Sequence, residues 1–242
     1  MNLIIDVGNT YVKLAVYSNN KLISKKIGTP DNWVSVAKQI LNFYSGITKG
    51  IISSVGRINQ KDISIISKQI KLINLSADTK LPFKNKYGTP KTLGVDRIAL
   101  VSASVEQFTD KNVLIIDAGT CITYDFITSE NDYLGGAISP GIRTRYTSLN
   151  NLTANLPLLE TKAPKHIIGK STADAIHSGI VNGILKEIDG TIQEYAKIYE
   201  DLTVILTGGD TKLLSKRLKS SIFANSNFLL EGLNYILEFN TK

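Results

Sequence analysis

Two short stretches combine a carboxylate, a glycine and a threonine in the same order. Residues 6–13 read DVGNTYVK and residues 117–125 read DAGTCITYD, each after an apolar run. Glycine lets backbone N–H groups approach a phosphate where a Cβ would obstruct them, and a carboxylate oxygen suits a phosphate-bound Mg2+. The first stretch alone is better explained as an ordinary Gly-Asn hairpin turn beside a capping aspartate. The two together predict a paired phosphate-binding site.

An internal repeat carries these two turns. Residues 3–8 (LIIDVG) and 114–119 (LIIDAG) differ at one position and lie 111 residues apart. Each copy continues with a β-branched or aromatic run (11–17; 122–127), a polar turn, a further run (22–27; 133–138) and a helical stretch (31–44; 142–152). The pattern predicts two three-stranded meanders, each followed by a helix.

The remaining chain alternates strands and helices, which indicates an α/β protein. The first half contains a predicted strand at 51–55, a helix at 61–69, a strand at 72–75, a loop at 76–92 and a helix at 94–108. The second half contains a long helix at 172–199, a strand at 202–206, a helix at 210–219, a strand at 222–224 and a last helix from 228. We expect two domains, residues 1–110 and 111–242, clasped across a cleft.

Composition limits the class of protein. The 242 residues are 43% hydrophobic and 20% charged, with no long uninterrupted apolar stretch, so no membrane span is expected. The first residues show neither a basic segment nor a small-residue cleavage site, so no signal peptide is expected. One cysteine, Cys121, fits a reducing cytoplasm, and its position in a strand suggests a small core residue. The net charge is +7, and lysine is dense in residues 61–91, a segment that has few aromatics and no nucleic-acid motif. It is better explained by solvated faces that attract anionic substrates than by nucleic-acid binding.

A third glycine turn, VILTGGD at residues 204–210, follows a predicted strand and precedes a helix. The three turns, in this order, resemble those of the actin, heat-shock ATPase and sugar-kinase superfamily. That resemblance implies two duplicated ribonuclease H-like domains and Mg2+ bound with ATP. An ordinary strand-to-helix turn is the alternative for the third turn taken alone.

Further motifs narrow the resemblance to one family. GVDR at 94–97, GGAISPG at 135–141, GKST at 169–172 and Tyr87, seven residues before Gly94, resemble type III pantothenate kinase. The likeness extends over nearly the whole chain. It implies ATP-dependent phosphorylation of pantothenate to 4′-phosphopantothenate, the first step of coenzyme A biosynthesis, by a homodimer.

The same resemblance implies roles for individual residues. Asp96 would be the proton acceptor, and Asp117 would bind a monovalent cation, K+ or NH4+. The implied ATP-binding residues are Asp6, Val7, Gly8, Asn9, Thr10, Tyr11, Val12, Lys13 and Thr120. The implied pantothenate-binding residues are Tyr87, Gly94, Val95, Asp96, Arg97 and Thr172.

Side-chain chemistry gives independent expectations for these positions. Asp96 falls in the first turn of a helix, where the dipole favours a carboxylate, although a helix-start acid is usually not catalytic. Arg97 presents a planar fork to a carboxylate or phosphate, or else forms a surface ion pair. Ser171 or Thr172 is the expected N-cap of the long helix. His177 is expected to be structural or solvent-facing.

Two features concern the substrate cavity and the subunit interface. Arg143 and Arg145 add charge where the family usually has smaller or apolar residues, which puts the lining of the substrate cavity in doubt. The predicted helix 172–199 carries isoleucines four residues apart and further apolar residues beside them, namely Ile176, Ile180, Ile184, Ile188, Ala173, Val181 and Leu185. The stripe should cover the helix's own sheet, and the broader surface suggests contact with a second subunit.

Two other functions stay open at this point. One is another kinase of the same superfamily that acts on a sugar or a small acid. The other is a nucleotide-binding regulatory protein that has kept the fold without turnover. Retention of Asp6, Asp96 and Asp117 argues against the second.

Overall fold

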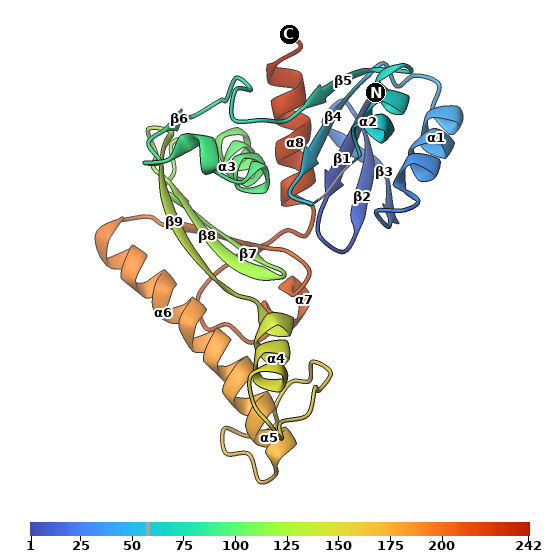
Figure 1. The fold of residues 1–242 in the computed structure, drawn as a ribbon. Coiled ribbons are helices and arrows are strands. Elements are labelled where there is room, and N and C mark those ends of the chain that lie inside the picture. The colour runs from blue at the N-terminus through green and yellow to red at the C-terminus, as the bar shows by residue number, and fades with distance from the viewer. Residues whose placement is uncertain (57–58) are drawn as a thin grey trace. The chain divides into compact units, whose positions relative to one another are not determined.

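The computed structural model describes residues 1–56 and 59–242 and divides the chain into two compact units (Figure 1). The first unit comprises residues 1–109, 131–133 and 227–242; the second comprises residues 110–130 and 134–226. The C-terminal helix α8 (Phe228–Phe239) therefore lies in the first unit. The expected limits, 1–110 and 111–242, follow the sequence repeat and not these compact units.

The first unit is built on a five-stranded mixed sheet. Its strands are β1 (Asn2–Val7), β2 (Val12–Ser18), β3 (Lys21–Gly28), β4 (Lys49–Ser54) and β5 (Lys71–Asn74), in the order β3-β2-β1-β4-β5. The meander β1-β2-β3 is antiparallel, whereas β4 runs parallel to β1 and β5 parallel to β4. Alternate residues of β1 therefore point to opposite faces of the sheet.

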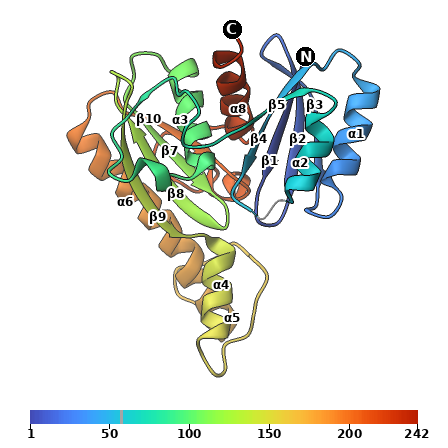
Figure 2. The same ribbon diagram turned by 45° about the horizontal axis from the view of Figure 1, so that its top comes forward.

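Helices cover both faces of this sheet (Figure 2). Leu3, Ile5 and Val7 pack in a core that includes residues of α1 (Trp33–Phe43) and α2 (Gln60–Ser67). Helices α3 (Val95–Gln107) and α8 pack against each other and contact the sheet at β4. Gly232 of α8 permits this close packing, because a Cβ there would collide with the carbonyl oxygen of Ala99. The face with α3 and α8 also carries Asp6, which alternates with Leu3, Ile5 and Val7.

The second unit repeats the strand order of the first. Its strands are β7 (Val113–Ala118), β8 (Cys121–Ile127), β9 (Asp132–Pro140), β10 (Thr203–Thr207) and β11 (Phe223–Ala224), in the order β9-β8-β7-β10-β11. Strand β8 is antiparallel to β7, whereas β10 is parallel to both β7 and β11. Strand order and direction thus confirm the duplication that the repeated hexapeptides predict.

The expected loop 76–92 contains two short elements. Strand β6 (Lys84–Asn85) pairs in parallel with the start of β9, at residues 132–133, and a 3-10 helix follows at Pro90–Thr92. These residues all belong to the first unit. A two-residue strand carries too little periodicity to be recognised from sequence.

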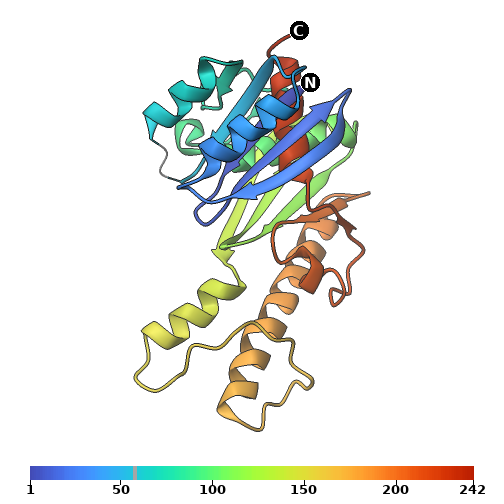
Figure 3. The same ribbon diagram turned by 90° about the vertical axis from the view of Figure 1, so that its right-hand side faces the viewer.

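Helices of the second unit differ from the expected ones in length. The predicted helix 172–199 consists of α5 (Thr172–His177), a π-helical turn (Ser178–Asn182) and α6 (Gly183–Ile198), visible in Figure 3 with α4 (Ile142–Asn151). Its four spaced isoleucines are buried in one core with Leu114, Ile116 and Phe126 of the sheet. Helix α7 (Thr211–Leu214) is shorter than the predicted 210–219. No helix in the described ranges is long and apolar enough to cross a membrane.

Candidate active site

The first glycine turn joins β1 to β2. Asp6 pairs with Lys13 and Val7 with Val12, which leaves residues 8–11 as the turn. The Gly8 N–H donates to the Tyr11 carbonyl at 3.0 Å and closes it. Asn9, Thr10 and Tyr11 are exposed beyond that bond. The turn therefore presents polar groups and backbone at the carboxyl end of β1, with Asp6 behind it.

Asp6 is a buried carboxylate with a basic partner. It is 5% exposed, and Lys13 Nζ lies 3.4 Å from its Oδ2. Burial raises the pKa of Asp6, the Lys13 charge and hydrogen bond lower it, and the charge of Asp96 raises it, with a raised pKa as the net result. Asp6 and Asp96 are therefore close enough to interact electrostatically within the first unit.

Ser53 is a neighbour of Asp6 that sequence analysis missed. It lies in register with Asp6 on the parallel strand β4, so both side chains point to the same face of the sheet. Ser53 is fully buried, and its Oγ has no hydrogen-bond partner among the described residues. A carboxylate beside an unsatisfied hydroxyl is an oxygen-only donor set, which fits Mg2+ bound with a nucleotide.

Asp96 lies in the first turn of α3, as the sequence predicted. The Arg97 N–H donates to Asp96 Oδ1 at 2.8 Å, which fixes the carboxylate at the start of the helix. The N-cap is Gly94, and a Cβ at that position would collide with Asp96 Oδ1. The Gly-Val-Asp-Arg segment thus sets the orientation of the carboxylate through its glycine as well as through the helix start.

Arg97 is buried among aromatic rings and is not a surface residue. It is 5% exposed, and its guanidinium carbon lies 5.4 Å from the ring centroid of Tyr87 and 6.0 Å from that of Tyr133. The two rings are 6.1 Å apart. Cation–π contacts of this kind hold a guanidinium in a fixed plane. The structure therefore brings Tyr87 and Arg97 together, and it adds Tyr133, which the sequence did not identify.

The second glycine turn joins β7 to β8 and is one residue shorter than the first. Asp117 pairs with Thr123 and Ala118 with Ile122, so residues 119–121 form the turn. The Gly119 N–H donates to the Cys121 carbonyl at 2.9 Å. Cys121 is exposed, which corrects its expected place in the core. It closes the turn, where the chain reverses at the end of the sheet, instead of lying within a covered strand.

Asp117 is flanked by two hydroxyl residues. Thr123 on β8 and Thr207 on β10 are both in register with it. Thr207 is 2% exposed, and Thr123 Oγ1 is buried without a hydrogen-bond partner among the described residues. Thr123 occupies the place that Lys13 has beside Asp6. Where the first turn holds a cationic amine, the second therefore has neutral oxygen donors.

The Gly-Gly turn after β10 packs directly against this carboxylate. Gly208 has φ +95°, and a Cβ there would collide with Asp117 Oδ1 and the Ala118 carbonyl oxygen. The Asp210 N–H donates to that same carbonyl at 3.0 Å. The third turn predicted from sequence therefore packs against the second turn, and only glycine can occupy its first position without a collision.

Thr120 lies at the N-terminus of α4. Its carbonyl oxygen accepts from the Gly141 N–H at 3.0 Å and from Thr144 Oγ1 at 2.6 Å. A Cβ on Gly141 would collide with the Gly119 carbonyl oxygen, so the glycine lets the helix begin against the turn. Helix N-termini favour anions, and the exposed Thr120 side chain is next to this one.

Thr172 lies on the surface of the second unit. Ser171 is the N-cap of α5, because its Oγ accepts from the Asp174 N–H at 3.1 Å, and Thr172 follows exposed. It lines a groove of about 660 Å3 together with Arg145, Ser148, Leu149, Leu156, Ala175, Ile176, Gly179 and Ile180. The groove is mostly apolar, with Thr172 and Arg145 among its few polar side chains.

The two unusual arginines are neutralised within the second unit. Arg145 contacts Glu187 Oε2 at 2.5 Å and Ser139 Oγ at 2.9 Å, and Arg143 contacts the Leu159 carbonyl at 2.8 Å and Glu160 at 3.3 Å. Burial alone would raise the pKa of Glu187, but hydrogen bonds from Arg145 and Ser139 lower it below its ordinary value. Arg145 therefore lies at the groove as half of an ion pair.

Two sheets of identical strand order, each with a carboxylate–glycine turn after its first strand, define the actin-like fold of ATP-dependent kinases. Solved structures agree. A ROK family glucokinase from Streptomyces griseus, in complex with glucose and AMPPNP, has a TM-score of 0.55 at 11% identity and covers 99% of this chain and 98% of its own. A Campylobacter jejuni protein assigned to a Baf family of transcriptional activators has a TM-score of 0.65 at 23% identity, with 98% of each chain covered.

Sequence comparison defines the particular family. The model of type III pantothenate kinase matches residues 2–194. A type III pantothenate kinase of Christiangramia forsetii is 52% identical over 240 residues, which are 99% of either chain. The chain belongs to the type III pantothenate kinase family.

Proposed function

We propose that this protein transfers the γ-phosphoryl group of ATP to the primary hydroxyl of pantothenate and so makes 4′-phosphopantothenate, the first step of coenzyme A biosynthesis. The observation that carries the proposal is the 52% identity, over 99% of either chain, to a protein named type III pantothenate kinase. The buried Asp6 with Lys13, and Asp96 at the start of α3, supply the carboxylates and the cation that such a reaction needs.

ATP is held in this proposal by residues 6–13 and by Thr120. The exposed turn 8–11 would receive phosphate oxygens on its backbone, and Lys13 would move from Asp6 toward the phosphates. The N-terminus of α4 beside Thr120 supports an anion at the second turn. Mg2+ bound with ATP neutralises phosphate charge, and Asp6 and Ser53 would hold it directly or through water.

Pantothenate contacts Tyr87 and residues 94–97 in this proposal, and Asp96 acts as the base. Its carboxylate takes the hydroxyl proton as the hydroxyl oxygen attacks the γ-phosphorus and the bond to the ADP oxygen breaks. Arg97, held in plane by Tyr87 and Tyr133, would orient the pantothenate carboxylate. Phosphoryl transfer depends mainly on such alignment and on charge neutralisation, so the chain's contribution is positioning.

Asp117 binds a monovalent cation in this proposal, K+ or NH4+. Thr123 and Thr207 flank the carboxylate and would complete an oxygen donor set. The unsatisfied Thr123 Oγ1 is the observation that favours a ligand here. Neutral hydroxyls around one carboxylate suit a singly charged ion better than a divalent one, because fewer negative charges surround it.

The active species in this proposal is a cytoplasmic homodimer. The mostly apolar groove of about 660 Å3 supports a subunit contact, and Thr172 within it would reach pantothenate bound by the partner. A single cysteine on an exposed turn is compatible with a reducing compartment.

A substrate screen tests the proposal. ADP release is followed with pantothenate and, separately, with glucose and N-acetylmannosamine, the acceptors of the rival sugar-kinase function. We expect turnover with pantothenate and none above background with either sugar. Turnover with a sugar and none with pantothenate would assign the chain to the rival class.

A further inference from the structure

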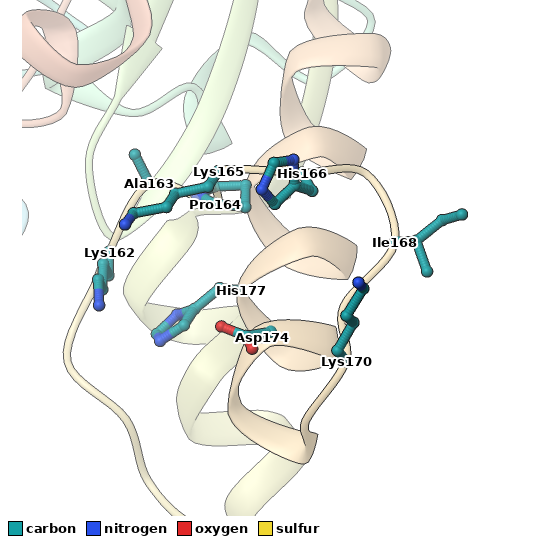
Figure 4. A pocket seen from close by; sticks show the side chains of 9 residues that line it. All are labelled: Lys162, Ala163, Pro164, Lys165, His166, Ile168, Lys170, Asp174 and His177. Carbon is teal, nitrogen blue, oxygen red and sulfur yellow. The ribbon is translucent and has the colours of Figure 1, made fainter.

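A basic pocket in the second unit is not used by the proposed reaction. It measures about 300 Å3 and lies where residues 162–170 pass over α5. It is lined by Lys162, Ala163, Pro164, Lys165, His166, Ile168, Lys170, Asp174 and His177. Figure 4 shows the lysines and His166 on the loop, and Asp174 and His177 on the helix beneath. A pocket of this size is at the lower end of those that hold small ligands.

The charge in this pocket is unbalanced. Lys162, Lys165 and Lys170 form no ion pair with any described residue, and Asp174 is the single acid of the lining. Ser171 Oγ donates to Asp174 Oδ2 at 2.7 Å. Three lysines therefore line a cavity that has one carboxylate, and Figure 4 shows Lys170 on the opposite side from Lys162 and Lys165, so the lining carries a net positive charge.

The loop that carries these lysines is held to the helix. Ser178 Oγ donates to the Ile167 carbonyl at 2.5 Å, and a Cβ on Gly169 would collide with the backbone of Asp174 and Ala175. The loop is thus fixed to the helix at two points by contacts that do not depend on a ligand.

A buried histidine forms the floor and is oriented by a tyrosine. His177 is 8% exposed, and its Nδ1 lies 2.6 Å from the Tyr146 hydroxyl. Burial raises the pKa of Tyr146, so the phenol stays protonated at neutral pH. Nδ1 is thereby occupied, and Nε2 is the ring nitrogen left for the pocket. Nε2 is a donor in the tautomer in which the phenol donates to Nδ1.

We infer that this pocket binds a small phosphate-bearing anion through His177 Nε2 and the ammonium groups of Lys162, Lys165 and Lys170. The lining holds three ammonium groups against one carboxylate, and a phosphate at neutral pH is an anion that offers mainly acceptor oxygens to such donors. The anion has two candidate sources, inorganic phosphate and the phosphate monoester of the proposed product. The second source rests on the proposed function, and the first does not.

Histidine NMR provides a local test, because the chain has only two histidines. The full-length protein is labelled at the imidazole rings, His166→Asn assigns the two signals, and inorganic phosphate or 4′-phosphopantothenate is titrated at constant ionic strength. We expect a saturable shift of the His177 signal and a protonated Nε2 in the free protein. A lower dissociation constant for 4′-phosphopantothenate would identify the product as the source of the anion. Equal dissociation constants would mean that the pocket recognises the phosphate group alone.

Matched variants separate this site from general charge effects. Lys165→Met and Lys170→Met should each weaken binding about tenfold, the usual cost of one charge-assisted contact. Lys186→Met removes an exposed lysine of α6 outside the pocket and should leave the constant unchanged. The inference is overturned if neither anion gives a saturable His177 shift, or if Lys186→Met weakens binding as much as the pocket variants. Loss of kinase activity has no bearing on the phosphate titration, so this result stands independently of the proposed function.

Discussion

At the residue scale, Asp6 combines burial with a function that requires its charge. Burial is the largest influence on its pKa and raises it, and the Asp96 charge adds to this effect, so ionising this carboxylate costs more in the folded protein than in water. A group of this kind destabilises the fold at neutral pH in exchange for a role in binding. Asp6 should therefore be a position where stability and activity oppose each other.

Asp6→Asn should stabilise the protein at pH 7 and abolish its kinase activity. The pKa of Asp6 in the folded protein lies above its ordinary value of 3.8, which applies to the unfolded chain. The protonated carboxyl therefore contributes stability below pH 3.8, and this contribution is lost as pH rises through the folded-state pKa. The midpoint temperatures of thermal unfolding of the variant and the parent should diverge as pH rises. A difference of about 1 kcal/mol in the free energy of unfolding would appear as about 2–4 °C. Asp31→Asn, at an exposed aspartate, should show no such divergence. A less stable Asp6→Asn protein at every pH would contradict this account of Asp6.

Asp117→Ala should remove the monovalent-cation response and lower activity. Thr123→Val is the more selective change, because it removes an Oγ1 that has no protein hydrogen bond while keeping the side-chain volume. We expect Thr123→Val to fold with at least parental stability and to need more K+ for half-maximal activity. If both variants respond to K+ as the parent does, the cation binds elsewhere.

At the scale of elements, the glycine turns are fitted to one another. The turn after β10 has room for no side chain at its first position, where φ is +95° and a Cβ would collide with Asp117. Its second position, Gly209, has nothing within 4 Å of a Cβ. The two adjacent glycines therefore form a natural matched pair for mutation.

Gly208→Ala should cost about 1–3 kcal/mol of unfolding free energy from backbone strain, and it should displace Asp117. Gly209→Ala should stay within about 0.5 kcal/mol of the parent, as is usual for an exposed site. Chemical denaturation measures both, and the K+ requirement reports on Asp117. Equal effects of the two substitutions would mean that the close approach at Gly208 does not govern this site.

Sequence predicted the elements whose signals are local. The repeated hexapeptide indicated both first strands, and Gly-Val-Asp-Arg indicated the start of α3. Ser53, Thr123 and Thr207 could not be predicted as partners of the two aspartates, because strand register is set by packing and not by a local motif. Cys121 was wrongly predicted to lie in the core. It belongs to the exposed second turn, which is one residue shorter than the first, and the sequence repeat does not reveal this difference in length.

At the scale of the whole molecule, the chain forms two compact units from one duplicated plan, but its C-terminal helix completes the first unit. Asn2 Nδ2 donates to Asn234 Oδ1 at 2.7 Å, and Lys49 Nζ lies 3.0 Å from Glu238 Oε2. These contacts join β1 and β4 to α8. No local periodicity indicates that a terminal helix returns to the first unit, so sequence analysis assigned it to the second half.

A homodimer is the expected species in solution. The four isoleucines of the stripe are buried in the core of the second unit, and Ile176 and Ile180 also line the groove at Thr172, which is the apolar surface expected to meet a partner. Sedimentation at micromolar concentration should give about twice the chain mass of 26.5 kDa. Ala175→Glu, at an exposed position of the groove, should shift the protein toward monomer and reduce activity. A fully active monomer would contradict a role for Thr172 across subunits.

Phosphorus NMR of the complete reaction, run with wild type and with Asp96→Asn, tests the central claim most directly. An asparagine still suits a helix start, so the variant should fold, and loss of a general base costs about 10²–10⁴-fold in rate. Wild type should convert ATP and pantothenate to ADP and a phosphate monoester on the primary hydroxyl of pantothenate, and Asp96→Asn should make that product at least about a hundredfold more slowly. Absence of this monoester with wild type, or its formation by Asp96→Asn at the wild-type rate, would contradict the account.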